Sequence, residues 1–255
     1  MPLVEIIIGE KTSPETLAKG FDYVQQIMKT PIVVNDSRGF YTSRCFATYP
    51  MEGMALLLEG QHPHSIEMAG LKAGMPVGPL AVQDEVSLSL SLYVLEQTRK
   101  DLAAEGKEAS EPVGVAVIEK MVKQLDRPGK KAGKGFYDYP ASGKKHLWAG
   151  LVEHFPLADT QLPQQEMTDR MLFAQANEAA KCYEERVVKS VADANIGSIF
   201  GWGFAPFQGG VLQFINAYGL PQFVKRAEEL AAKCGERFKP ARLLVEMAAA
   251  GKRFK

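Results

Sequence analysis

The chain has 255 residues, 46% of them hydrophobic and 24% charged, which is typical of a globular protein of one or two domains. Its 30 basic residues balance 30 acidic ones, so no net field favours nucleic acid or an anionic membrane surface. No stretch approaches the roughly 18 apolar residues of a membrane span, and the N-terminus lacks the basic start of a signal peptide. The 3 scattered cysteines favour reduced thiols over a disulfide framework. We therefore expect a cytoplasmic protein.

Residues 1–36 are predicted to form a strand, a helix and a second strand. Residues 3–8 are a β-branched apolar run, which is typical of a buried strand. The run Thr-Ser-Pro-Glu at 12–15 has the features of a capping box with proline in the first turn, so a helix is expected to begin there. Residues 32–34 form the second strand. Because so small a sheet cannot cover itself, this segment is either a small α+β cap or the edge of a larger α/β domain.

The pattern from residue 39 onward is helical. A wide apolar face runs to about residue 58, and Pro50 is expected to kink that helix about one turn upstream. Further helices are expected at 65–73, 87–102 and 115–125, with a rigid turn at 74–79 and a charged loop at 105–112. The predicted domains are 1–36, a helical module at 37–140, a proline-bearing linker at 141–165, and a second helical module at 166–255.

One pattern occurs twice in the chain. An arginine is followed by glutamates eight and fifteen residues later, as Arg44, Glu52 and Glu59 and again as Arg170, Glu178 and Glu185. The offset is 170 − 44 = 126, and after one insertion it becomes 127, which pairs Gly70, Gly74 and Pro79 with Gly197, Gly201 and Pro206. Repeated units usually bury a face that neither could hide alone. We therefore predict two stacked helical modules.

Known cofactor and metal motifs are absent from the sequence. The segments Gly133-Lys-Gly135 and Gly201-Trp-Gly203 both lack the third glycine of a dinucleotide-binding turn, and neither follows a predicted strand. The histidines have no cysteine or carboxylate cluster beside them and are better explained as surface residues: His62, His64, His146 and His154. We predict no cofactor-binding and no metal-ligating residue in this chain.

Two charged features leave alternatives open. Glu5 is a lone carboxylate in an apolar strand, so it either has a partner in a buried setting or points to solvent from an edge strand. The loop around Lys130 and Lys131 could meet a phosphate through its exposed backbone N–H groups, or it could be a solvated surface loop. The composition alone does not choose between these alternatives.

Five ordered motifs together resemble the 3-hydroxyacyl-CoA dehydrogenases. They are Met1-Pro-Leu-Val-Glu-Ile-Ile, Thr30-Pro-Ile-Val-Val-Asn-Asp36, Gly39-Phe40, Gly74-Met-Pro-Val-Gly-Pro79 and Gly133-Lys-Gly-Phe-Tyr137. The doubled helical module resembles the multifunctional α-subunit of the fatty-acid oxidation complex. The resemblance implies a mainly α fold with two tandem modules of the 6-phosphogluconate-dehydrogenase C-terminal-like type. It also implies that residues 1–36 are a remnant of an NAD-binding Rossmann domain.

The same resemblance implies roles for three residues. In the family, a histidine about a dozen residues before the position of Glu5 takes the proton from the 3-hydroxyl, and the glutamate orients it. Glu5 is therefore expected to orient a histidine that is absent from this chain. Ser43 takes the place of a substrate-contacting asparagine and Phe200 that of a substrate-contacting tyrosine. NAD and an acyl-CoA substrate are expected only in the intact protein.

The expected function is that of the C-terminal portion of a β-oxidation dehydrogenase, inactive as it stands. Expected partners are the missing Rossmann domain, a hydratase domain, a thiolase subunit and further copies of the chain. The alternative is a non-catalytic helical interaction or oligomerisation module. Residues 1–36, without the rest of their sheet, are expected to be disordered, docked on the helices or paired with another copy.

Overall fold

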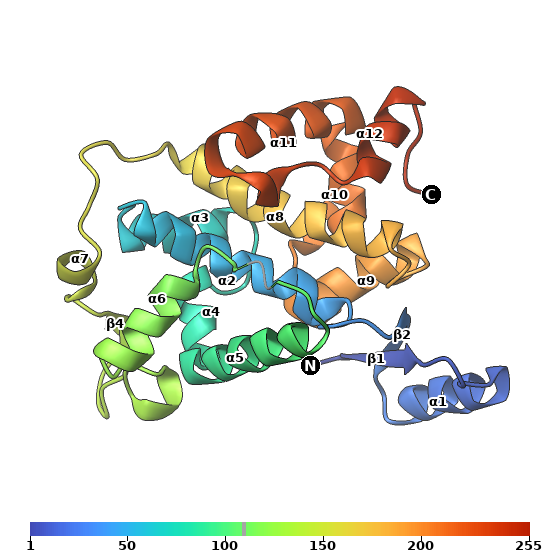
Figure 1. The fold of residues 1–255 in the computed structure, drawn as a ribbon, viewed down its shortest axis with the longest axis horizontal. Coiled ribbons are helices and arrows are strands. Elements are labelled where there is room, and N and C mark those ends of the chain that lie inside the picture. The colour runs from blue at the N-terminus through green and yellow to red at the C-terminus, as the bar shows by residue number, and fades with distance from the viewer. Residues whose placement is uncertain (109–110) are drawn as a thin grey trace. The chain divides into compact units, whose positions relative to one another are not determined.

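The structure, a computed structural model, describes residues 1–108 and 111–255 and is mainly helical (Figure 1). The strands are β1 (Leu3–Ile8), β2 (Thr30–Asn35), β3 (Tyr137–Asp138) and β4 (His146–Leu147). The helices are α1 (Pro14–Gln26), α2 (Thr42–Leu58), α3 (Pro63–Lys72), α4 (Pro79–Val86), α5 (Leu88–Ala104), α6 (Val115–Glu119), α7 (Leu151–His154), α8 (Gln164–Glu184), α9 (Val191–Trp202), α10 (Val211–Tyr218), α11 (Leu220–Cys234) and α12 (Arg242–Ala249). The charged loop predicted at 105–112 includes residues 109–110, which lie outside the described residues.

The chain divides into two compact units. The first unit comprises Met1–Thr48, Gly74–Pro76 and Leu172–Lys255, and the second comprises Tyr49–Ala73 and Val77–Met171. Both α2 and α8 pass from one unit into the other, so each unit contains part of both long helices.

The first unit begins with the strand–helix–strand segment that the sequence predicts. β1 and β2 pair in parallel, with Leu3 opposite Thr30 and Ile8 opposite Asn35. Ser13 caps α1 by accepting a hydrogen bond from the Thr16 backbone N–H at 3.1 Å. The predicted capping box is incomplete because Thr16, rather than a glutamate, stands three residues after the cap.

This segment docks on the rest of the first unit. α1 packs on the strands, while α9 contacts both β1 and β2 (Figure 1). The absence of a side chain at Gly197 of α9 lets Ile32 approach, because a Cβ there would lie 2.9 Å from Ile32 Cδ1. The outer edge of β2 meets residues 186–188, where the Asn35 backbone N–H donates to the Val187 carbonyl at 2.8 Å. Of the three expectations for residues 1–36, docking on the helices is the one the structure shows.

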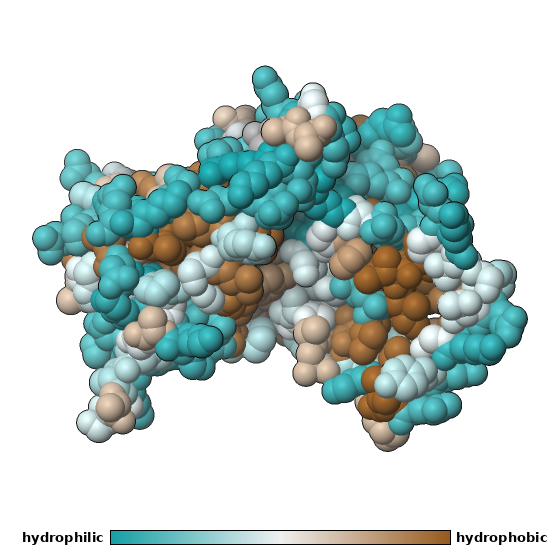
Figure 2. All heavy atoms as spheres, turned by 60° about the horizontal axis from the view of Figure 1, so that its bottom comes forward, coloured by the Kyte–Doolittle hydropathy of each residue, from teal (hydrophilic) through white to brown (hydrophobic). Residues whose placement is uncertain are grey.

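Apolar surface nevertheless remains exposed on this segment. Figure 2 shows hydrophobic side chains gathered over the strand–helix–strand region, at the right of the view. The exposed large hydrophobic residues of this segment are Met1, Ile7, Phe21, Tyr23, Ile27 and Met28. Within the part of the chain that the structure describes, β1 pairs with β2 alone, so its other edge is open.

The core of the helical part of the first unit is aromatic. Phe173 of α8 stacks on Phe223 of α11 with ring centroids 4.3 Å apart. Phe214 and Tyr218 of α10 meet the same Phe173 ring edge-on, at 6.0 and 5.1 Å. Rings in these arrangements gain about 0.5–1.5 kcal/mol per pair beyond their burial. The cluster therefore fixes α8 against α10 and α11.

An ion-pair site in the first unit joins the two copies of the repeat. Arg44 on α2 donates through Nε to Glu178 Oε1 on α8 at 2.5 Å. Its Nη1 and Nη2 donate to the two carboxylate oxygens of Glu185 at 2.5 and 3.0 Å. This bidentate geometry is the strongest form of an arginine–carboxylate contact. The arginine of the first copy is thus paired with the glutamates of the second.

The second unit contains the reciprocal site. Arg170 on α8 donates through Nε to Glu52 Oε1 on α2 at 2.5 Å, and through Nη1 and Nη2 to Glu59 at 2.5 and 2.7 Å. Here the burial is deeper, because the Arg170 and Glu52 side chains are only 1% and 2% exposed. The arginine of the second copy is therefore paired with the glutamates of the first. The common spacing of the repeat produces an exchange of partners.

The second unit also contains a helix that the sequence analysis missed. Residues 74–79 were predicted as a turn, but α4 starts at Pro79, and proline at a first helical position favours a helix start. The buried Glu67 carboxylate of α3 accepts hydrogen bonds from Leu80 N at 2.7 Å and from the Tyr137 hydroxyl at 2.7 Å. A carboxylate at a helix N-terminus satisfies unpaired N–H groups and the helix dipole. This partner lies 13 residues before Leu80, on the preceding helix, so the pattern around Pro79 does not show it.

The glycine-rich segment after residue 130 packs against α4. The buried Asp84 carboxylate accepts hydrogen bonds from Phe136 N at 2.8 Å and Tyr137 N at 2.9 Å. It also accepts one from the Tyr139 hydroxyl at 3.1 Å. A Cβ at Gly135 would lie 2.0 Å from Asp84 Oδ1, so only glycine allows this approach. The close packing around Asp84 therefore explains the glycines of this segment better than a phosphate-binding loop does.

Two other predicted segments differ in detail. The helix predicted at 115–125 is α6 followed by a π-helical turn at Lys120–Gln124. The proline-bearing stretch after residue 140 contains the short elements β4 and α7. Helix α2 continues through Pro50 to Leu58.

Replacing Arg170 with methionine should destabilise the chain more than the same change at Arg44. Arg170→Met removes the cation beside the buried Glu52, which should cost about 3–5 kcal/mol. Arg44→Met should cost about 1–3 kcal/mol, because Glu178 keeps 18% of its side chain exposed. Urea unfolding measures both, with Lys19→Met in a fully surface pair as the control. Equal losses at Arg44 and Arg170 would contradict the difference in burial.

Asp84 should make stability fall as the pH rises from about 4 to 6. Burial raises the pKa of Asp84 to about 6, against the lowering effects of its backbone donors, Tyr139 and Arg127. The folded state therefore holds this proton more tightly than the unfolded chain. The stabilisation that this proton provides is fully present below the pKa of Asp84 in the unfolded chain. It is lost as the pH rises through the pKa of Asp84 in the folded state, which lowers the free energy of unfolding by about 3 kcal/mol at most.

The comparison of the native chain with Asp84→Asn isolates this effect. The variant should be less stable at every pH, because an amide nitrogen cannot accept from a backbone N–H. The gap in unfolding free energy between the two proteins should narrow between pH 4 and 6. A gap that widens over this interval would show that the carboxylate prefers its charged form in the folded state.

Candidate functional site

Glu5 lies in the middle of β1, and its side chain crosses to the start of α2. Its Oε1 accepts hydrogen bonds from the backbone N–H groups of Tyr41 and Thr42, both at 3.0 Å. Its Oε2 accepts from the Thr42 hydroxyl at 2.5 Å. Of the two alternatives for Glu5, the structure shows a half-buried carboxylate with partners, although these are hydrogen-bond donors rather than a cation. Glu5 thereby caps α2 from another element.

The backbone before α2 is shaped to present these donors. Gly39 and Phe40 both have left-handed conformations, with φ of 78° and 48°. Such a conformation is costly for a side chain as large as that of phenylalanine, by about 1–2 kcal/mol. Consecutive N–H groups turned in one direction form a concavity that binds an anion. The Glu5 carboxylate occupies this concavity and compensates for the strain at Phe40.

Tyr41 fixes the start of α2 to its neighbours in the first unit. Its hydroxyl donates to the Ala194 carbonyl of α9 at 2.9 Å, and its ring packs edge-on against Trp202 at 5.4 Å. Trp202 in turn donates from Nε1 to Gln175 Oε1 of α8 at 2.9 Å. Burial raises the pKa of the Tyr41 phenol well above its usual value, so it remains a neutral donor. The position of the Glu5 site is therefore set by a buried polar frame.

Ser43 and Phe200 both lie near the Glu5 site in the first unit. Ser43 is exposed at the second position of α2, and Phe200 is 44% exposed near the end of α9. Their sequence neighbours, Thr42 and Gly201, are in contact, because a Cβ at Gly201 would lie 2.7 Å from Thr42 Cγ2. The structure thus brings together the segments of β1, α2 and α9 that carry the three predicted site residues. Sequence reasoning did not identify Thr42, which binds Glu5 and lies against Gly201.

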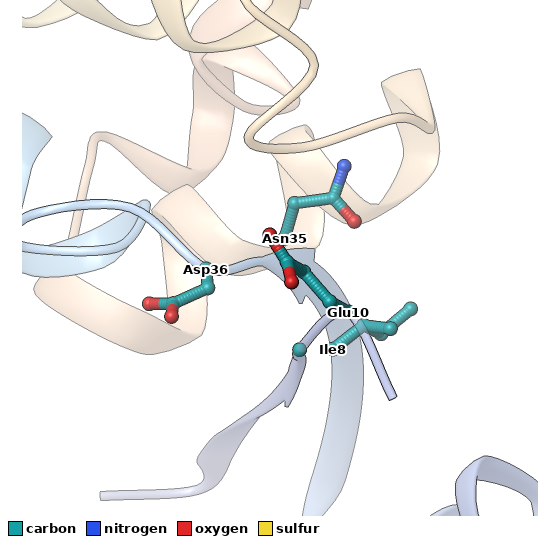
Figure 3. A pocket seen from close by; sticks show the side chains of 5 residues that line it. Ile8, Glu10, Asn35 and Asp36 are labelled. Carbon is teal, nitrogen blue, oxygen red and sulfur yellow. The ribbon is translucent and has the colours of Figure 1, made fainter. Parts of the chain in front are cut away.

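A separate hollow of about 440 Å³ lies at the carboxyl ends of β1 and β2. It is lined by Ile8, Gly9, Glu10, Asn35 and Asp36. Figure 3 shows the Asn35 and Asp36 side chains pointing away from each other. Asn35 Nδ2 donates to the Arg186 carbonyl at 2.8 Å. The hollow contains none of the three predicted site residues.

The residues present do not fit a dinucleotide. Ligands of parallel α/β sheets bind beyond the carboxyl ends of the strands, where a glycine-rich turn meets a pyrophosphate. At that position this chain has the hollow with two carboxylates, Glu10 and Asp36, which would repel the pyrophosphate charge. We therefore assign no NAD-binding residue here.

Other kinds of site are also missing from the described residues. In the ranges 1–108 and 111–255, histidine, cysteine and carboxylate side chains form no group of three that could hold a metal ion. Over the same ranges, no helix has both the length and the apolar character needed to cross a membrane. The phosphate alternative for the basic loop has no direct support, since Lys130 pairs with Glu85 at 3.2 Å.

Two family models match adjacent parts of the chain, and the boundary between them lies near residue 38. Residues 39–139 match the family described as 3-hydroxyacyl-CoA dehydrogenase, C-terminal domain. Residues 1–37 match the family described as 3-hydroxyacyl-CoA dehydrogenase, NAD binding domain. Both matches begin or end within a few residues of the turn that presents Tyr41 and Thr42 to Glu5.

Individual relatives point the same way. The chain is 40% identical over 257 residues to the fatty acid oxidation complex subunit alpha of Shewanella amazonensis, covering 100% of this chain and 35% of the relative. It is 38% identical over 258 residues to the subunit of the same name from Shewanella loihica, covering 100% and 35%. The chain therefore spans about a third of the length of these curated relatives.

Solved structures share the fold. A 3-hydroxybutyryl-CoA dehydrogenase from Escherichia coli superposes with a TM-score of 0.77 at 20% identity, covering 98% of this chain and 68% of that one. The dehydrogenase part of a C. elegans multifunctional enzyme gives a TM-score of 0.63 at 21% identity, covering 96% and 56%. At these identities the likeness concerns the fold alone. The family matches, and not this likeness, identify the chain: it has the C-terminal domain of the 3-hydroxyacyl-CoA dehydrogenase family and a short piece of that family's NAD-binding domain, and it is homologous to part of the fatty acid oxidation complex α-subunit.

Proposed function

We propose that this chain is the C-terminal portion of an NAD-dependent (S)-3-hydroxyacyl-CoA dehydrogenase of fatty-acid β-oxidation. The reaction converts a 3-hydroxyacyl-CoA to the 3-ketoacyl-CoA. The observation that carries the proposal is the fixed carboxylate of Glu5, with Ser43 and Phe200 exposed close by. In this proposal, residues 1–36 end the NAD-binding domain, 37–140 and 166–255 are the two helical modules, and 141–165 link them.

Glu5 is suited to orient a histidine supplied by the rest of the NAD-binding domain. A carboxylate offers about four acceptor positions, and the donors from Tyr41 and Thr42 occupy three of them. One position on Oε2 can accept the N–H of an imidazole, which fixes the tautomer and supports the charge that the base acquires. The exposed hydrophobic residues and the open edge of β1 are suited to contact with the same missing domain.

Ser43 and Phe200 are proposed to contact the acyl-CoA. The Ser43 hydroxyl can donate a hydrogen bond to an oxygen of the substrate, with less reach than the family's asparagine. Phe200 keeps the aromatic face of the family's tyrosine without its hydroxyl, so it can contribute apolar contact only. NAD belongs to the intact protein, because the residues of this chain do not form its site.

The doubled module is proposed to act as an internal dimer interface. The support is the exchange of partners, in which Arg44 meets Glu178 and Arg170 meets Glu52. A two-fold dimer makes reciprocal contacts of this kind between two copies of one surface. The relatives are named as subunits of a complex. From this resemblance we further propose a hydratase domain and a thiolase subunit as partners, and a cytoplasmic location.

The chain alone should produce no NADH from 3-hydroxyacyl-CoA, because it contains neither the base nor a dinucleotide site. Absorbance of NADH in the presence of excess NAD and 3-hydroxybutyryl-CoA measures this. The longer protein, with the complete NAD-binding domain, should be active in the same assay. NADH formation by the 255-residue chain would contradict the first expectation, and an inactive longer protein would favour the non-catalytic interaction module.

Within the longer protein, Ser43→Ala should lower kcat/KM for 3-hydroxyacyl-CoA about tenfold, since one hydrogen bond of about 1.4 kcal/mol is lost. Ser43→Asn should retain or increase kcat/KM. Asp169→Ala, at the same position of the second copy (43 + 126 = 169), is the matched control and should leave kcat/KM within about twofold. Unchanged kinetics in Ser43→Ala would remove Ser43 from the substrate site.

A further inference from the structure

The direction of the Glu5 carboxylate depends on one side chain. The two backbone donors both bind Oε1, so they leave Oε2 to be placed by the Thr42 hydroxyl, at 2.5 Å. Oε2 is also the oxygen with an acceptor position left among the described contacts. A partial rotation of the carboxylate about its last bond would move Oε2 out of this position. The Thr42 hydroxyl opposes that rotation.

Thr42 is itself held by packing. The residue is only 8% exposed, and its Cγ2 methyl lies against Gly201 of α9. A Cβ at Gly201 would lie 2.7 Å from that methyl and 3.0 Å from Leu3 Cδ2, so the space is already filled. A β-branched side chain has few χ1 choices. With the methyl against α9, the hydroxyl is directed at Glu5.

The second copy of the repeat provides an internal comparison. The counterpart of Thr42 is Thr168 (42 + 126 = 168), which is similarly buried at 7% exposure. The Thr168 hydroxyl donates to the backbone carbonyl of Ala69, at 3.4 Å, and not to a carboxylate. The helical repeat is therefore built with a threonine at this position whether or not a carboxylate is present. The contact with Glu5 is specific to the copy that adjoins the proposed active site.

We infer that Thr42 is a positioning residue of the dehydrogenase: its hydroxyl, directed by the contact with Gly201, fixes the Glu5 oxygen that orients the catalytic histidine. This inference rests on the proposed function for the histidine, whereas the hydroxyl–carboxylate geometry belongs to the chain itself. It predicts that a change on α9, without contact to the substrate, alters the turnover rate through Thr42.

The first experiment uses the 255-residue chain and hydrogen exchange. In Thr42→Val the carboxylate loses its fixing donor, so the amides of residues 41 and 42 should exchange at least about tenfold faster. Thr42→Ser keeps a hydroxyl and should restore native protection, and Thr168→Val should leave both amides unchanged. Gly201→Ala displaces the Thr42 methyl while keeping the hydroxyl residue, and should also accelerate exchange. It serves as the second probe should Thr42→Val not fold.

Unchanged protection of both amides in Thr42→Val and in Gly201→Ala would overturn the inference at this level. So would equal acceleration in Thr168→Val, because the effect would then be one of general helix stability.

The second experiment measures kinetics in the longer protein. Thr42→Val should lower kcat about tenfold with KM for the acyl-CoA within about twofold, because an orienting contact acts on turnover rather than on binding. Thr42→Ser should recover most of kcat, and Thr168→Val should match the native enzyme. Native kcat in Thr42→Val, within an active enzyme, would overturn the positioning role. A native longer protein without dehydrogenase activity would instead defeat the proposed function, and the exchange result would remain as a property of the fold.

Discussion

The burial of arginine and glutamate between two copies of one module is the constraint on which the rest of the structure depends. A charged side chain leaves water only when an opposite charge and hydrogen bonds replace its hydration. Arg170 and Glu52 are almost fully buried, so α2 and α8 must keep the register that brings them together. In the other unit Arg44 and Glu178 impose the same condition on the other ends of the two helices. Each unit thereby holds its own part of the two helices in register.

The contact between α2 and α8 in the first unit holds the start of α2, where the candidate site occurs in one copy of the repeat only. α2 begins at Thr42, and its first N–H groups need an acceptor that the helix itself cannot supply. In the first copy that acceptor is Glu5 from β1, and the result is a carboxylate held by three donors. In the second copy, Thr168 lies inside the longer helix α8 and donates to a backbone carbonyl. Duplication thus provides the architecture, while the proposed chemistry is confined to the copy beside the sheet.

Local features of this protein could be predicted from the sequence, and its long-range contacts could not. The bounds of β1 and the start of α1 followed from a short apolar run and the Ser13–Pro14 start signal, which act over a few residues. The equal spacing of the two Arg–Glu sets predicted a repeated module, because spacing is visible in the chain. Which glutamate meets which arginine was not visible, since the partners lie 111–141 residues apart.

The candidate site shows the same division. Glu5, Ser43 and Phe200 were chosen from a family resemblance, and the fold brings their segments together. The role of Glu5 as the cap of α2 was missed because Tyr41 and Thr42 lie 36 and 37 residues away. Helix α4 was missed for a related reason: its N-terminus is satisfied by Glu67 of another helix, and its Pro79 start was assigned to a turn.

The exchange of partners between the copies is tested most directly by two double-mutant cycles in urea unfolding. One cycle combines Arg170→Met with Glu52→Gln, and the other combines Arg170→Met with Glu178→Gln, the glutamate of its own copy. We expect a coupling free energy above about 1 kcal/mol in the first cycle and less than about 0.5 kcal/mol in the second. Coupling of Arg170 to Glu178 instead of Glu52 would show that each copy satisfies its own charges, and would contradict an interface formed by exchange.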